Sequence, residues 1–192
     1  MLHREDLWSL EEYSEKRKVF RETVLAHKEN RRVLLGGHVL LTFEDSQTIK
    51  YQIQEMLRIE KIFEAQAIQE ELDAYNPLIP DGDNWKCTLL IQFEDEDERK
   101  RRLTELVGIE DRVWVRVGDL EKTYPIADED MDRSNDDKTS AVHFMRYQLT
   151  SSQVDAAKTG HAIAFGVEHE AYPCDEIVLG ERQRKSLVAD LS

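Results

Sequence analysis

The segment Arg31–Asp45, RRVLLGGHVLLTFED, contains two apolar runs that are separated by Gly36 and Gly37. A glycine pair allows the positive backbone angles of a tight turn, so this segment predicts a β-hairpin. Asp45 or Ser46 can then cap a following helix, because their side chains accept hydrogen bonds from its first N–H groups. A hairpin that leads into a helix favours an α+β fold over a doubly wound parallel sheet.

Several helices are expected, and three of them are expected to lie on the sheet. The helical spacing of apolar residues predicts an N-terminal helix within residues 1–30, a long helix over about 46–75 and a C-terminal helix over about 180–191. Pro77 ends the long helix, since the residue before a proline disfavours helical angles. All three helices are expected to pack on the sheet, because an amphipathic helix must bury its apolar face.

Four further strands are expected after the long helix. They lie within KCTLLIQFED (86–95), DRVWVRVGD (111–119), AVHFMRYQLT (141–150) and HAIAFGVEHE (161–170), where residues alternate in polarity or form short apolar runs. Between Ala127 and Ser140 the chain is polar and densely charged, which indicates a long exposed loop. Together these elements predict a single domain over residues 1–192, with a helix over 1–30 and a largely antiparallel sheet in the core over 31–192.

The charge and composition of the chain indicate which classes of partner it can bind and where it is located. With 26 Lys and Arg against 40 Asp and Glu, the net charge is −14, which disfavours nucleic acid because phosphate binding depends on basic side chains. No apolar run approaches the roughly 20 residues that span a bilayer, and the N-terminus has no signal-peptide core. Cys87 and Cys174 have no CxxC partner, which is typical of free thiols in a reducing compartment. We therefore expect a cytoplasmic protein that binds neither nucleic acid nor membrane.

Glutamates occur where the long helix should be apolar. At ~100° per residue from Ile49, Glu60 falls at ~20°, in the middle of the apolar stripe, with Glu64 and Glu71 on the same side. A buried carboxylate needs a cation, a metal or a proton to offset its lost hydration. One interpretation is an ion pair between Glu60 and Arg17, which lies on the apolar stripe of the N-terminal helix.

A second interpretation is a metal site. Glu60 and Glu64 would supply oxygen ligands, and His143 and His169 in the predicted strands would supply nitrogen ligands. Such a set suits iron, manganese or zinc, while a chain that holds no metal is equally consistent with the sequence. No glutamate has a histidine three residues later, which argues against a ferritin-like di-iron site.

The acidic loop contains a partial calcium-binding pattern. Asp128, Asp130 and Asp132 match the alternating start of an EF-hand loop. Arg133 stands where that loop needs glycine, and Thr139 stands where it needs glutamate, so we exclude an EF-hand. The sequence also lacks the Gly-x-Ser-x-Gly motif of hydrolases and the phosphate-binding GxxxxGK motif.

Three segments carry a resemblance to a known family: YQIQEMLRIEKI (51–62), ELDAYNPLIP (71–80) and TSAVHFMRY (139–147). With these segments the chain resembles a bacterial family of single-domain proteins of unknown function, and the similarity covers almost the whole chain. The genes of that family often neighbour those of a rubrerythrin and of an iron-sulfur protein related to heterodisulfide reductase. The resemblance implies a setting in cytoplasmic peroxide or redox metabolism, and it implies no activity and no functional residue.

Three classes of function are consistent with these observations. The first, which we favour, is an accessory protein that docks on a redox partner, either a rubrerythrin or an iron-sulfur protein, with its acidic surface steering the association. The second is a metal-binding protein or metal-dependent enzyme that uses Glu60, Glu64, His143 and His169. The third is a purely structural or self-associating domain.

Overall fold

A computed structural model describes residues 1–131, 133–135 and 137–192, and these form two compact units. The helical unit comprises residues 1–30 and 44–80, and the strand unit comprises residues 31–43 and 81–192. The predicted α+β class is confirmed. That both units belong to one domain over residues 1–192 stays a prediction.

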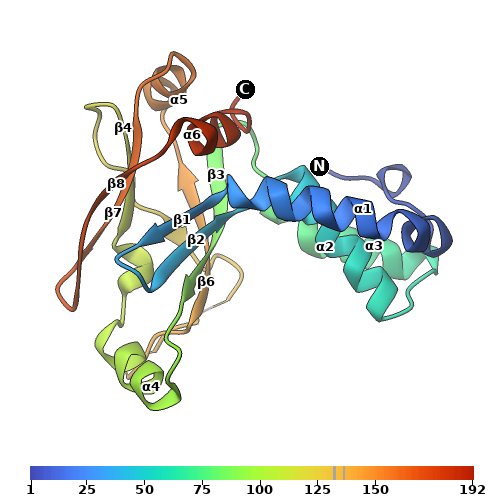
Figure 1. Cartoon of the computed structure of the whole chain (residues 1–192), viewed down its shortest axis with the longest axis horizontal. Helices are drawn as coiled ribbons and strands as arrows, with labels where there is room; N and C mark the ends of the chain where they lie inside the picture. The colour runs from blue at the N-terminus through green and yellow to red at the C-terminus, as the bar shows by residue number, and fades with distance from the viewer. Residues whose placement is uncertain (132, 136) are drawn as a thin grey trace. The chain divides into compact units, whose positions relative to one another are not determined.

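The helical unit is built from three α-helices, which Figure 1 shows side by side. Its elements are η1 (Arg4–Asp6), α1 (Leu10–Glu29), α2 (Ser46–Ile59), α3 (Ala65–Tyr75) and η2 (Asn76–Leu78). As predicted, Asp45 caps α2: its carboxylate accepts from the Thr48 N–H, and its own N–H donates to the Thr48 hydroxyl, both at 2.9 Å. Ile49, Ile53, Leu57 and Leu72 are completely or almost completely buried and form the core of this unit.

The prediction of one long helix over residues 46–75 is wrong, because the helix ends at Ile59 and a new one begins at Ala65. Lys61 has a φ of 56°, which is the left-handed conformation that ends helices. The next N–H group, that of Ile62, donates to the Leu57 carbonyl at 2.9 Å, as in the Schellman helix ending.

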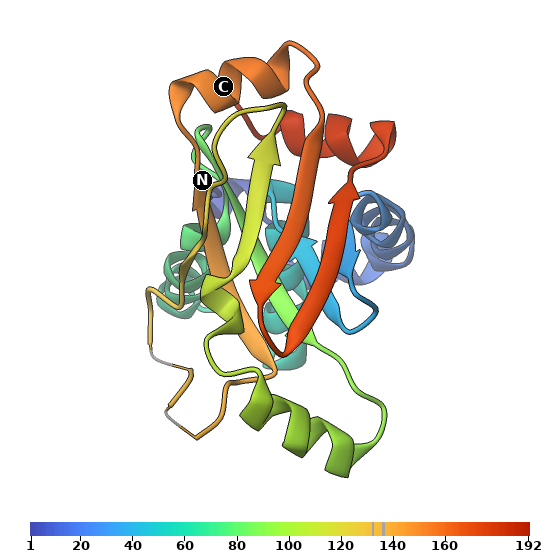
Figure 2. The same cartoon turned by 90° about the vertical axis from the view of Figure 1, so that its left-hand side faces the viewer.

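The strand unit contains two antiparallel sheets, ordered β1-β2-β3-β6-β5 and β4-β7-β8 (Figure 2). The predicted antiparallel arrangement is confirmed, although it is divided over two sheets. The strands are β1 (Arg32–Leu35), β2 (Val39–Phe43), β3 (Asn84–Ile91), β4 (Val113–Val117), β5 (Ile126–Ala127), β6 (Val142–Gln148), β7 (Ile163–His169) and β8 (Tyr172–Val178). The helical segments of this unit are α4 (Glu96–Glu105), η3 (Ile109–Asp111), α5 (Ser151–Lys158) and α6 (Glu181–Val188).

The two sheets share one apolar core. Phe165 of β7 lies 5.3 Å from the Phe43 ring and 5.8 Å from the Tyr147 ring, both of which belong to the larger sheet. The predicted C-terminal helix is confirmed as α6, and its buried Leu187 packs into the same core. Arg31 is 2% exposed, and its Nη2 atom forms an ion pair with Oδ2 of Asp190, just after α6, at 2.6 Å.

The predicted hairpin at Gly36 and Gly37 is confirmed, and Leu35 pairs with Val39 across it. The Tyr172 hydroxyl of β8 donates to the Leu35 carbonyl at 2.7 Å. The same oxygen accepts from the N–H groups of His38 and Val39, at 3.0 and 3.1 Å. One phenol therefore satisfies three backbone groups at the turn of this hairpin.

The structure bears on two further expectations. In the described part of the chain, no helix combines the length and the apolar character that crossing a bilayer requires. Cys87 in β3 and Cys174 in β8 are not joined by a disulfide, as predicted. The cytoplasmic location stays a prediction.

Candidate functional site

The two predicted glutamate ligands lie at the connection between α2 and α3. Glu60 is the residue that ends α2, and Glu64 is the residue that precedes α3. Both side chains are exposed, so the prediction that Glu60 lies in a buried apolar stripe is wrong. Glu60 is the last right-handed residue of the helix, directly before the turn at Lys61, so the apolar stripe does not continue on its far side.

The predicted ion pair between Arg17 and Glu60 is also wrong, because Arg17 binds Glu55 instead. Its Nε and Nη2 atoms donate to the two carboxylate oxygens of Glu55 at 2.7 and 2.9 Å, and the Tyr13 hydroxyl donates to one of them at 2.6 Å. The guanidinium lowers the pKa of Glu55 to about 2, while burial raises the pKa of Tyr13. The half-buried carboxylate that needs a cation is thus Glu55.

His169 stabilises the chain at the end of β7. Its Nε2 atom donates to the Val107 carbonyl at 3.1 Å, and its Nδ1 atom accepts from the Ala171 N–H at 3.2 Å. These partners assign the proton to Nε2, because a backbone carbonyl cannot donate. Both ring nitrogens are therefore engaged with the backbone.

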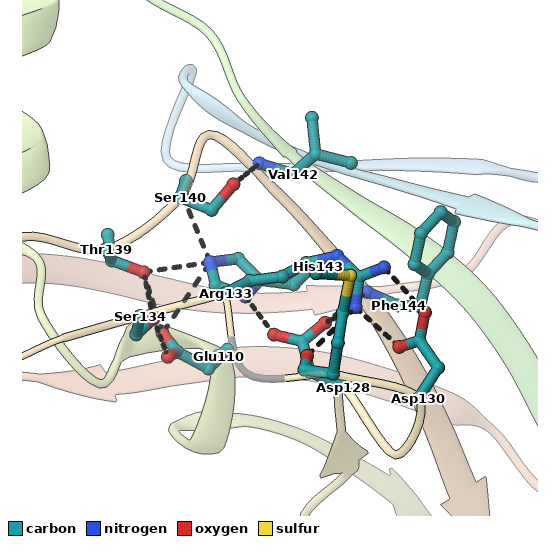
Figure 3. Close-up of polar contacts among 11 residues, drawn as sticks. Glu110, Asp128, Asp130, Arg133, Ser134, Thr139, Ser140, Val142, His143 and Phe144 are labelled. Carbon is teal, nitrogen blue, oxygen red and sulfur yellow. Dashed lines mark hydrogen bonds and ion pairs between the residues drawn. The ribbon is translucent and has the colours of Figure 1, made fainter.

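His143 of β6 is completely buried at the centre of a polar network (Figure 3). Its Nδ1 atom lies 2.6 Å from Asp128, and its Nε2 atom lies 2.8 Å from the Thr139 hydroxyl and 3.0 Å from the Ser140 carbonyl. The Asp128 carboxylate only accepts, so Nδ1 of the ring donates to it.

Glu110 of η3 provides the second carboxylate of this network. It is 7% exposed, and its Oε2 atom lies 3.8 Å from Nε2 of His143. It accepts a hydrogen bond from Thr139 at 3.1 Å and another from the Ser134 hydroxyl. The network thereby attaches two hydroxyl groups of the loop that precedes β6 to η3 and to the sheet (Figure 3).

Asp128 stabilises the other end of the same loop. It has a φ of 51°, which is unusual for a residue other than glycine, and its Oδ1 atom accepts from the Phe144 N–H at 3.0 Å. Arg133 donates to Asp128 at 3.1 Å and to Asp130 at 2.7 Å, and this pair lowers the pKa of Asp130 to about 2. Asp132, which completes the partial EF-hand pattern, lies outside the described residues.

The order Thr139, His143, Asp128 is that of a hydroxyl–imidazole–carboxylate triad, with Nε2 facing the hydroxyl and Nδ1 facing the acid. Thr139 is 2% exposed and His143 is 0% exposed, so a substrate does not reach either group in this conformation. The network is therefore best explained as a buried polar anchor for the loop.

The described residues contain no group of three or more His, Cys, Asp and Glu side chains that is arranged to hold a metal. Glu60 and Glu64 belong to the helical unit, whereas His143 and His169 belong to the strand unit. That these four residues share one metal site stays a prediction.

The helical unit has an open apolar groove beside the connection that carries Glu60 and Glu64. It encloses about 260 Å³. Its lining residues are Arg4, Leu7, Trp8, Ser9, Leu10, Leu57, Ile62, Phe63 and Ile68. The Phe63 side chain at its edge is 71% exposed, and the nearby Ile59 is 57% exposed. Large apolar groups that remain in water next to a groove are typical of binding surfaces.

Comparison with known proteins gives the family of this chain. A family model described as "Protein of unknown function (DUF3501)" matches residues 1–191. The chain belongs to the DUF3501 family. The resemblance to a family of unknown function is thus confirmed, while the gene neighbourhood with a rubrerythrin stays a prediction.

A solved structure supports the same relationship. A crystal structure of a protein of unknown function from Burkholderia pseudomallei is 47% identical to this DUF3501 chain. The alignment covers 100% of this chain and 99% of the Burkholderia chain, and the TM-score is 0.93. No curated protein matches the sequence.

Proposed function

We propose that this DUF3501 protein is a non-enzymatic accessory protein that acts by binding another protein. The observation that carries this proposal is the exposed Phe63 beside the apolar groove of the helical unit. Aromatic anchors beside apolar pockets contribute most of the free energy at many protein interfaces. The most prominent acid–base group of the strand unit, His143, is by contrast sealed from solvent.

The partner that we propose is a redox or peroxide-stress protein of the cytoplasm, either a rubrerythrin or an iron-sulfur protein. Its identity follows from the family resemblance and not from a contact in this chain. The net charge of −14 would steer association toward a basic patch on that partner. This attraction would weaken as added salt screens the charges.

Calorimetric titration with each purified candidate partner, at low and at high salt, tests this proposal. We expect a complex that weakens with salt, and we expect Phe63→Ala to raise its Kd by about tenfold or more. Val19→Ala is the matched control, since Val19 of α1 is 69% exposed and does not line the groove. Failure of both candidates to bind at low salt would reject the redox partnership.

A metal-binding protein or metal-dependent enzyme is the second candidate function. Its four predicted ligands, Glu60, Glu64, His143 and His169, carry the carboxylates and imidazoles that bind iron, manganese and zinc. Elemental analysis of protein purified without an affinity tag under low oxygen tests this candidate. About one metal per chain, lost in Glu60→Ala or His143→Ala variants that remain folded, would favour it over the accessory role.

A further inference from the structure

We infer that the groove binds a segment of the partner in which a large apolar side chain stands next to a carboxylate. This inference rests on the proposed function and adds the chemistry of the segment that is recognised. Three features of the helical unit support it: an ordered apolar wall, an exposed aromatic anchor, and an arginine at the groove whose guanidinium has no partner among the described residues.

The apolar wall of the groove is ordered before any partner binds. The backbone N–H of Trp8 donates to the side chain of Gln54 at 2.7 Å, and the Gln54 amide donates to the Trp8 carbonyl at 3.3 Å. Gln54 is completely buried, so water does not compete for these bonds. The Trp8 ring also packs edge-on against Phe20 at 4.9 Å. An ordered wall reduces the entropy cost of binding.

The anchor Phe63 is presented by a defined turn of the backbone. Lys61 adopts a left-handed conformation, and the Ile62 N–H donates to the Leu57 carbonyl at 2.9 Å. Ile62 packs against the core of the unit, while the next residue, Phe63, is 71% exposed. The turn therefore holds an aromatic side chain in water at the edge of the groove.

Arg4 gives the groove its charge. It is the one charged residue among the described residues that line the groove. Its side chain is exposed and forms no hydrogen bond or ion pair with another described residue. A segment that enters the groove thus meets an apolar surface with one positive charge beside it. A carboxylate on that segment can accept charge-assisted hydrogen bonds from the guanidinium, whereas a lysine at the same place is repelled.

Two lysines add positive charge next to the wall. The ammonium groups of Lys50 and Lys16 lie 4.0 and 5.1 Å from the centre of the Trp8 ring. Burial lowers the pKa of Lys50; nearby Asp6 raises it, and the charge of Lys16 lowers it. An anion that binds near this ring would offset the repulsion between the two ammonium groups.

No carboxylate of the described residues lines the groove. Asp6 and Glu12 each accept a backbone N–H, at 2.8 and 3.3 Å, and Glu60 and Glu64 are exposed to solvent. At physiological salt, exposed charges act over a screening length of only about 8 Å. The net charge of −14 therefore acts on the partner as a whole, while Arg4 acts on the segment inside the groove.

The size of the groove favours a protein side chain over a small-molecule ligand. Its volume of about 260 Å³ lies below the range of about 300–1,000 Å³ that is usual for small-molecule sites. A helix that inserts one apolar row into such a groove is a common mode of peptide recognition.

Three synthetic peptides test this inference on the full chain. Each is a helix of about 18 residues with leucine on one face and glutamine on the other, and the residue beside the central leucine is glutamate, glutamine or lysine. Peptides with so little charge avoid a general attraction to a chain whose net charge is −14. Fluorescence anisotropy at physiological salt gives each Kd. We expect the glutamate peptide to bind about two- to fivefold more tightly than the glutamine peptide, and the lysine peptide to bind most weakly.

A charge reversal locates the carboxylate. Arg4→Glu should reverse the order, so that the lysine peptide binds most tightly and the glutamate peptide most weakly. Arg21→Glu is the matched control, since Arg21 is exposed and lies on α1 about 16 Å beyond Leu10, outside the groove. It makes the same change in net charge and should keep the order of the wild type. Both arginines are exposed, so thermal unfolding of both variants should match the wild type.

A second variant tests the apolar anchor. Phe63→Ala should weaken binding of all three peptides by about tenfold and leave their order unchanged. Val19→Ala, at an exposed position of α1 outside the groove, should leave each Kd unchanged.

Three results would overturn the inference: no difference between the glutamate and lysine peptides, an order that Arg4→Glu does not reverse or that Arg21→Glu also reverses, or a Kd that Phe63→Ala leaves unchanged. Self-association that Arg4→Glu abolishes would also overturn it, because the groove would then hold an acidic segment of a second copy. Binding of a redox candidate that depends on Phe63 but not on Arg4 would reject this inference and keep the proposed function. Peptides that bind as expected while both redox candidates fail would reject only the identity of the partner.

Discussion

The ring of Tyr172 occupies the space where a side chain at Gly36 would begin. A Cβ atom at Gly36 would lie 2.8 Å from Cε1 of Tyr172, and the φ of 58° at this glycine is unfavourable for other residues. The phenol cannot move away without losing its bonds to the hairpin backbone. The hairpin turn and β8 are thus interlocked.

Gly36→Ala should destabilise the strand unit by roughly 2–4 kcal/mol, because it combines backbone strain with a clash against a buried ring. Gly37→Ala is the matched control, since Gly37 also has a positive φ but no atom lies within 4 Å of its added Cβ. It should cost only about 1–2 kcal/mol. Urea unfolding measures both values, and equal costs would contradict the interlock.

Glu55 should make the helical unit sensitive to acid. Its pKa is lowered from 4.5 to about 2 by Arg17, so its contribution to stability is present above pH 4.5 and is lost as the pH falls toward 2. Because the Arg17 side chain is 35% exposed, we expect the contribution to be only roughly 1–2 kcal/mol.

Glu55→Gln removes this acid-dependent contribution. Urea unfolding of the wild type and the variant is monitored by helix content at several pH values between 6 and 3. The difference in their free energies of unfolding should shrink as the pH falls. Glu60→Gln controls for the general loss of negative charge, because Glu60 is exposed at the end of α2. A pH profile of Glu55→Gln that coincides with that of Glu60→Gln would refute the role of the Arg17 pair.

Local signals predicted most elements of the fold. The glycine pair, the cap at Asp45 and the alternation in Val113–Val117 each depend on neighbouring residues, and each is confirmed. The division into two sheets depends on pairings between distant segments, such as Trp85 with Tyr147, and no local pattern determines them.

The break in the predicted long helix is not visible in the angular pattern of its apolar residues. Ile53 and Leu57 lie at ~40° and ~80° from Ile49, and Ile68 and Leu72 would lie at ~100° and ~140° on a continuous helix. Such a spread is within the width of one apolar face, so the pattern fits a single helix. The helix ends at the left-handed backbone of Lys61, a conformation that the spacing of apolar residues does not predict.

The buried network was only partly predictable. His143 was singled out as a strand histidine, but its partner Asp128 lies 15 residues earlier in the loop. Glu110 approaches from η3 and contacts Thr139 across 29 residues of sequence. No spacing rule joins these positions, because they come from separate segments of the chain.

Lys61→Gly should stabilise the helical unit by about 0.5–1 kcal/mol, since glycine adopts the left-handed conformation without strain. Glu60→Gly, one residue earlier at a right-handed position with a φ of −83°, should instead be neutral or destabilising. Thermal unfolding distinguishes the two variants. A loss of stability in Lys61→Gly would mean that the lysine side chain itself supports the turn.

Asp128 and His143 should behave as one coupled unit. Each single change to alanine should destabilise the strand unit by about 3–5 kcal/mol, because it leaves a buried polar partner unsatisfied. The double variant should destabilise the unit by about 1–3 kcal/mol less than the sum of the single variants, since it removes both partners together.

Arg146 and Glu129 form the matched control cycle. Their 2.7 Å ion pair also involves β6, but the Glu129 side chain is 50% exposed. The coupling energy of this pair should therefore stay below about 1 kcal/mol. Additive costs at Asp128 and His143 would contradict the anchoring role of the network.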